Sequence, residues 1–221
     1  MRARHIRLVL SLAIATGLTT SPFAPSSAAT LPDTVVHGTA KLAKKLRVDM
    51  DGDGRLDTVR LYTSGKSYQV KVTNARKRTA TYRGKLKQTG LDWYWGFKAA
   101  ALDGAAGAEV MLQTDCTEEC AVYRMLTWRK GRLVVEKSPE GRTTWSVGGP
   151  AGEINDYYFS ESGGQHYTDH VVGSETAEDC EADVTRWVWS STKWTKQQAT
   201  RVLLDCDTFV ARYADDVNWV H

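Results

Sequence analysis

The feature that most constrains this 221-residue chain is a short segment in which aspartates recur at closely spaced positions. With Asp49 as position 1, aspartate also stands at positions 3, 5 and 9, and glycine at position 6: Asp51, Asp53, Asp57 and Gly54. Carboxylates this close repel one another, and Arg55 is the only local counter-charge. A hard dication such as calcium, which takes about six to eight oxygen ligands, would remove that repulsion. The segment therefore predicts a calcium-binding loop.

This loop differs from an EF-hand, which requires flanking helices and a bidentate glutamate at its last position. The residue at that twelfth position is Arg60, and residues 58–63 alternate in the manner of a β-strand. The loop must therefore close through Asp57, and it leads directly into a strand.

The pattern Asp-x-Asp-x-Asp-Gly-x-x-Asp followed by a strand resembles the calcium loops of FG-GAP and VCBS repeats, which form the blades of integrin-type β-propellers. In that family the loop joins two strands, and calcium fixes the loop without performing chemistry. The resemblance implies a secreted bacterial repeat protein with Ca²⁺ as its cofactor. Carried over by position, the implied ligands are Asp49, Asp51, Asp53, the backbone carbonyl of Arg55, and Asp57.

Internal similarity indicates that the loop belongs to a repeated unit. Residues 51–59 can be laid against residues 103–110 at an offset of 52, and residues 68–76 against residues 123–131 at an offset of 55. A weaker third copy ends in residues 185–194. Units of about 50 residues have the size of a four-stranded blade, and such blades cannot bury their faces alone.

The second copy has Ala105 where the first has Asp53, so we expect a turn there without tightly bound calcium. The predicted fold class is all-β: a propeller-like array of antiparallel β-blades with two clear repeats and a weaker third. Propellers usually need at least four blades, so the alternatives are an incomplete propeller, a compact stack of sheets, and assembly between chains. We expect a signal peptide at residues 1–29 and an N-terminal linker at residues 30–45. A single β-repeat domain should follow at residues 46–221. Its three repeats span about 46–98, 99–140 and 141–205, and its C-terminal tail spans 206–221.

Residues 1–29 have the pattern of a secretory signal peptide. Three arginines precede an apolar run at residues 8–18, and small residues at Ser27 and Ala29 suit the signal peptidase. The apolar run is too short for a membrane span, which needs roughly 20 residues. We therefore expect a secreted protein, cleaved near Ala29, without a membrane span.

The net charge of +3 comes from the three arginines of that leader. The remaining chain is neutral but asymmetric: residues 30–98 carry 15 basic and six acidic side chains, and residues 99–221 carry 11 and 20. Neutrality disfavours generic nucleic-acid binding. The basic half is a candidate face for anionic cell-wall polymers.

Four cysteines in an oxidising compartment favour two disulfides, for which three pairings exist. The apolar runs 111–114 and 121–126 predict a hairpin with the first two cysteines facing each other at its mouth. Residues 184–190 and 199–204 predict a second hairpin, with the last two cysteines equidistant from its turn near Lys193. The expected disulfides are Cys116–Cys120 and Cys180–Cys206.

Two tryptophans, Trp93 and Trp95, form a dense aromatic cluster with their neighbours. If exposed, they would make a sugar-stacking platform or a hot spot for a protein partner. Because the cluster directly precedes the turn of the second repeat, burial between two blades is the favoured interpretation.

No convergent catalytic set is visible in the sequence. His166 and His170 have the spacing of two metal ligands, but the glycines beside them favour a loop or strand over a helix. Ser160 and Ser162 lack the Gly-x-Ser-x-Gly elbow of a nucleophilic serine. The sequence predicts a secreted, calcium-binding, non-catalytic binding or structural module whose partner is an extracellular polymer or protein. The alternatives are a cell-wall or glycan-binding module and a small secreted hydrolase that uses one of the two histidines.

Overall fold

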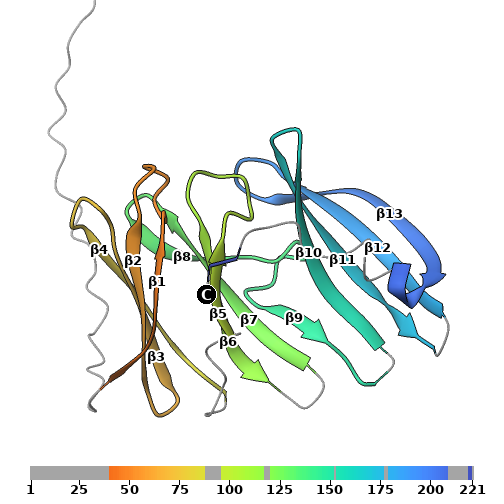
Figure 1. Cartoon of the computed structure of the whole chain (residues 1–221), viewed down its shortest axis with the longest axis horizontal. Helices are drawn as coiled ribbons and strands as arrows, with labels where there is room; N and C mark the ends of the chain where they lie inside the picture. Colours follow the sequence, from red (N-terminus) through yellow and green to blue (C-terminus); the bar gives the residue numbers. More distant parts are fainter. Residues whose placement is uncertain are drawn as a thin grey trace, which may run out of the picture. The chain divides into compact units, whose positions relative to one another are not determined.

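The computed structural model describes residues 40–87, 96–116, 120–151, 153–176, 179–208 and 219–220, which all belong to one compact unit, Val36–His221. Strands dominate these residues and form three antiparallel sheets, so the all-β class is confirmed. Each sheet uses a continuous stretch of the chain, as the colours of Figure 1 show. The predicted signal peptide and the side chains of Trp93 and Trp95 lie outside the described residues.

The first sheet is a meander in which the strands pair in chain order. Its strands are β1 (Lys41–Val48), β2 (Asp57–Ser64), β3 (Ser67–Thr73) and β4 (Thr79–Lys85). Residues 58–63, predicted as a strand from their alternation, lie within β2. The β3 burial pattern alternates strictly because only one face of this sheet packs on a core.

The second sheet contains β5 (Phe97–Ala100), β6 (Glu109–Cys116), β7 (Cys120–Arg129), β8 (Arg132–Glu136) and β9 (Trp145–Gly148). The predicted hairpin is confirmed as the pair β6 and β7. β8 and β9 divide the far edge of β7 between them, β8 along one half and β9 along the other. The repeat boundary expected at residue 140 leaves β9 in the third repeat, whereas its pairing places it in the second sheet.

The third sheet contains β10 (Glu153–Ser162), β11 (Gln165–Glu175), β12 (Asp179–Trp189) and β13 (Trp194–Asp205), again paired in chain order. The predicted hairpin around Lys193 is confirmed as β12 and β13. The Cys180–Cys206 disulfide is also confirmed, and it ties the end of β13 back to β12. The Cys120 side chain lies outside the described part of the chain, so the Cys116–Cys120 disulfide stays a prediction.

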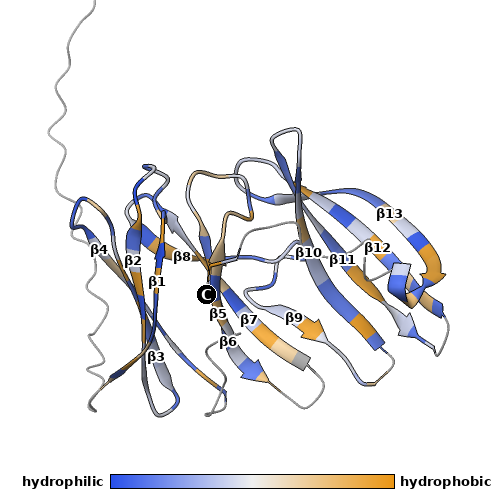
Figure 2. Cartoon of the chain, viewed as in Figure 1, coloured by the Kyte–Doolittle hydropathy of each residue, from blue (hydrophilic) through white to orange (hydrophobic). Residues whose placement is uncertain are grey.

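Two hydrophobic cores lie between consecutive sheets. The first core joins residues of the first and second sheets, and the second core joins residues of the second and third. β6 packs on both: Val110 and Leu112 belong to the first core, and Met111 to the second. The first six residues of β6 are therefore all buried. By contrast, most residues of β13, an edge strand of the third sheet, are exposed; in Figure 2 its middle is blue (hydrophilic) and orange appears near its end.

Candidate metal centre

The loop between β1 and β2 is shaped by hydrogen bonds to its first aspartate. The Asp49 carboxylate accepts from the backbone N–H groups of Gly52, Asp53 and Gly54, over N···O distances of 2.8, 3.2 and 2.7 Å. The φ angles of Gly52 and Gly54 are 72° and 80°, in the left-handed region that glycine enters without a steric penalty. These two glycines therefore let the loop curl around the Asp49 carboxylate.

Asp57 closes the loop from the first position of β2 and is only 1% exposed. Its Oδ2 accepts from the Met50 N–H at 2.9 Å, and its Oδ1 accepts from the Ala75 N–H at 2.9 Å. Burial raises the pKa of Asp57, and the nearby charges of Asp51 and Asp49 add to that rise, against the effect of the two N–H donors. The site is therefore short of positive charge.

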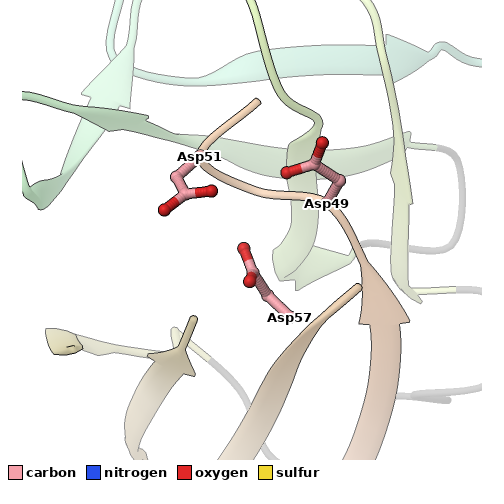
Figure 3. Close-up of side chains that lie close together, drawn as sticks. All are labelled: Asp49, Asp51 and Asp57. Carbon is pink, nitrogen blue, oxygen red and sulfur yellow. The ribbon is translucent and has the colours of Figure 1, made fainter. Parts of the chain in front are cut away.

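The carboxylates of Asp49, Asp51 and Asp57 converge, with one oxygen of each within 4.8 Å of the others. Figure 3 shows the three carboxylates gathered around a common space between the loop and the start of β2. Asp51 Oδ2 accepts from the Asn74 side-chain amide at 2.7 Å, but Asp51 Oδ1 is buried and has no hydrogen-bond partner among the described residues. No side chain in that part of the chain forms an ion pair with any of the three. Carboxylate oxygens in this arrangement are the ligands that calcium prefers.

Asp53, another predicted ligand, does not belong to this group. Asp53 Oδ1 accepts from the Arg55 N–H at 3.0 Å, and Asp53 Oδ2 lies 3.3 Å from Arg76 Nε. The structure thus gives Asp53 a guanidinium partner from the turn after β3. The role of the Arg55 carbonyl stays a prediction.

In the second sheet, the loop between β5 and β6 has the same construction. The Leu102 N–H donates to Glu109 Oε2 at 2.9 Å, which repeats the bond from Met50 to Asp57 at an offset of 52 residues. The φ angle of Gly104 is 71°, nearly that of the equivalent glycine in the first loop. The two loops also touch, because the Ala108 N–H donates to the Asp49 carbonyl at 2.8 Å.

An arginine occupies the second loop where an amide serves the first. Arg129 contacts Asp103 directly, and its Nη2 also lies 3.6 Å from Glu109 Oε1. Arg129 follows Asn74 by 55 residues, the same offset that relates the two repeats, and Asn74 makes the equivalent contact to Asp51. A built-in cation thus serves the second loop, which is a physical reason to expect no calcium there.

Glu136, at the end of β8, adds a third carboxylate to this buried group. Asp103 and Glu109 are 0% exposed and Glu136 is 5% exposed. Burial, followed by the charge of Asp103, raises the pKa of Glu109 to about 7. Burial, followed by the charges of Glu109 and Asp103, also raises the pKa of Glu136 well above its ordinary value. Neither Arg129 nor Glu136 was identified as a site residue from the sequence. The 55-residue offset from Asn74 could have indicated Arg129, and the position of Glu136 as a lone acid after an apolar run could have indicated Glu136.

The two histidines have separate surroundings. His170 Nδ1 lies 2.9 Å from Glu140 Oε1, and its ring stacks on Tyr157 with centroids 4.3 Å apart. Burial would raise the pKa of Glu140, but hydrogen bonding, led by His170, lowers it to about 2. His166 packs against Gly104, and its Nε2 lies 3.9 Å from Glu161. Among the described residues, neither histidine belongs to a group of potential metal ligands.

Comparison of the chain with known protein families, curated proteins and solved structures finds no match. No helix in the described ranges is long and apolar enough to cross a membrane. The Cys180–Cys206 disulfide fits a protein that matures in an oxidising compartment.

Proposed function

We propose that this chain is a secreted calcium-binding β-repeat protein, a non-catalytic binding or structural module in which calcium fixes the β1–β2 loop. The observation that carries the proposal is the convergence of Asp49, Asp51 and Asp57 around one space, with Asp51 Oδ1 buried and unpaired. An unpaired buried carboxylate oxygen is costly, and a bound cation removes that cost.

The arrangement of the sheets supports a blade-like repeat. Three antiparallel sheets follow one another along the chain, two of four strands and the central one of five, and each pair of neighbours shares a core. In the first two sheets the acidic loop joins the first strand to the second. We interpret the array as propeller-like, as in FG-GAP and VCBS repeats.

Calcium is expected to raise the melting temperature of the chelator-treated protein. A ligand at about 100 times its dissociation constant adds about 2.7 kcal/mol to the free energy of unfolding, or about 5–10 °C for a chain of this size. Asp51→Asn is expected to abolish the shift because it removes a ligand charge. The same substitution relieves repulsion, so the calcium-free variant should be at least as stable as wild type. Differential scanning calorimetry with and without millimolar calcium measures both.

The matched control is Asp183→Asn, an exposed aspartate of β12, which should keep the full calcium shift. A wild-type protein whose melting temperature ignores calcium would contradict the proposal. So would an Asp51→Asn variant with the wild-type shift.

A second candidate function, binding of an anionic cell-wall polymer, is favoured by the outer face of the first sheet. Asp57 is the only acid in β1–β4, and its side chain is buried at the start of β2. Arg60 and Lys71 are partners in register, on the face opposite the core residues Val59 and Val72. Other cations of that face lie on β1 and β4: Lys45, Arg47, Arg83 and Lys85.

On this alternative, purified bacterial cell wall should retain the protein at low salt and release it at high salt. Arg60→Gln/Lys71→Gln should weaken retention about tenfold, whereas Lys196→Gln on β13 should leave it unchanged. Retention that survives the double substitution would discard this face. Trp93→Ala/Trp95→Ala is the parallel test of the predicted aromatic platform.

A further inference from the structure

A pocket of about 390 Å³ lies beside the candidate metal site, between elements of the first and second sheets. Asp51 lines it from the β1–β2 loop, and Arg76 and Arg78 line it from the turn after β3. Arg129 and Lys130 complete it from the end of β7 and the turn that follows. Four cationic side chains therefore share one pocket with one carboxylate of the metal loop.

Two of these cations have no carboxylate partner in the described part of the chain. Arg78 and Lys130 form no ion pair within the described ranges, whereas the other two cations are engaged by aspartates. Uncompensated positive charge around a pocket raises the local concentration of anions. The pocket is therefore suited to an anionic occupant.

The backbone at Lys130 supports a role for its side chain. Lys130 and Gly131 form a two-residue turn with φ angles of 51° and 80°, a turn in which asparagine followed by glycine fits best. Lysine adopts this left-handed conformation less readily than asparagine or glycine. Strained backbone of this kind clusters at binding sites, where the side chain is needed. Lys77, in the turn after β3, has a similar φ of 63° but does not line the pocket.

We propose that this pocket binds a phosphate ester, held by Arg78 and Lys130 and by a calcium ion in the Asp49–Asp51–Asp57 group; the proposal rests on the calcium site put forward above. Asp51 belongs to both the carboxylate group and the pocket wall. Without a dication its negative charge repels an anion, and a bound dication reverses the sign of that interaction. Binding of the ester is therefore calcium-dependent.

The pocket selects a phosphate ester over a carboxylate because of the number of donors. A phosphate group offers more acceptor oxygens than a carboxylate, so several charged donors can bind it at once, and arginine is well suited to such recognition. The volume also falls in the range of small-ligand pockets, about 300–1,000 Å³, which leaves room for the alcohol part of the ester.

The test is isothermal titration of the full chain with glycerol 1-phosphate, with calcium present or chelated. We expect affinity at least about tenfold higher with calcium, and the ester should raise calcium affinity by the same factor. Neither glycerol nor acetate should compete with glycerol 1-phosphate for the pocket. A parallel titration with inorganic sulfate shows whether any tetrahedral oxyanion binds there. Binding that is equal with and without calcium would overturn the proposal.

Lys130→Asn separates binding from folding. It should weaken glycerol 1-phosphate binding about tenfold and leave the melting temperature equal or higher, because asparagine suits the turn. Lys77→Asn, the matched control, should relax a similar backbone strain and leave binding unchanged. If calcium raises the melting temperature and no ester binds, the pocket proposal fails and the calcium proposal stands. If calcium has no effect, both proposals fail.

Discussion

Replacing Arg129 by methionine is expected to lower the free energy of unfolding by about 3–5 kcal/mol at pH 7.5. The substitution keeps much of the side-chain volume. Among the described residues it removes the one guanidinium in contact with Asp103 and Glu109, both 0% exposed. A buried carboxylate left without its counter-charge is among the most destabilising changes a protein can suffer. Urea denaturation followed by tryptophan fluorescence measures the loss.

The loss should depend on pH because Glu109 takes up a proton at a higher pH in the folded state than in the unfolded state. The pKa of Glu109 is about 7, against 4.5 for an ordinary glutamate. The folded state therefore binds this proton more tightly than the unfolded state, and the group's contribution to stability falls as pH rises from about 4.5 to about 7. The Arg129→Met loss should therefore be smaller at about pH 5 than at pH 7.5.

Arg132→Met is the matched control for Arg129→Met. Arg132 stands at the other end of the same turn, is exposed, and has no ion pair among the described residues. It should change stability by less than about 0.5 kcal/mol. A loss below 1 kcal/mol for Arg129→Met at pH 7.5, or an equal loss at both pH values, would show that Arg129 does not neutralise this group.

Removing the disulfide by Cys180→Ala/Cys206→Ala is expected to lower the free energy of unfolding by about 3.5 kcal/mol. The bond joins residues 26 apart, and its loss restores the corresponding entropy to the unfolded chain. The loss should appear without reductant, and dithiothreitol should bring wild type down toward the variant.

Cys116→Ala/Cys120→Ala is the companion variant. The predicted short loop would contribute about 2 kcal/mol to the free energy of unfolding if these two cysteines are bonded, and nothing through this mechanism if they are not.

For the Cys180→Ala/Cys206→Ala variant, a loss of less than 1 kcal/mol in the free energy of unfolding would contradict the role assigned to that disulfide.

The elements predicted from the sequence are those in which neighbours along the chain pair. The strand after the aspartate loop, the hairpin before and after the first cysteine pair, and the Cys180–Cys206 disulfide all follow from local alternation and symmetry around a turn. The pairing of β9 with β7 does not, because Gly148 pairs with Cys120 across an intervening strand and loop. In the folded sheet β8 pairs with only part of one edge of β7, and β9 pairs with the part that β8 leaves free.

The candidate site shows the same division. The spacing of Asp49, Asp51 and Asp57 reflects a local loop, and these carboxylates converge. Asp53 lies beside Arg76 because the next hairpin turn reaches back to the loop, a tertiary contact that spacing does not encode. Glu136 and Arg129 were missed because their role depends on three strands of one sheet meeting at its end.

The burial of β6 on both faces has a consequence for how this protein unfolds. Val110 and Leu112 belong to one core and the intervening Met111 to the other, so a single backbone segment holds both. In linear arrays of repeats, stability is the sum of unit terms and nearest-neighbour interfaces. The central unit takes part in both interfaces and cannot detach without exposing two apolar surfaces at once. We therefore expect unfolding to begin at either terminal sheet, and loss of the central sheet to be the cooperative event.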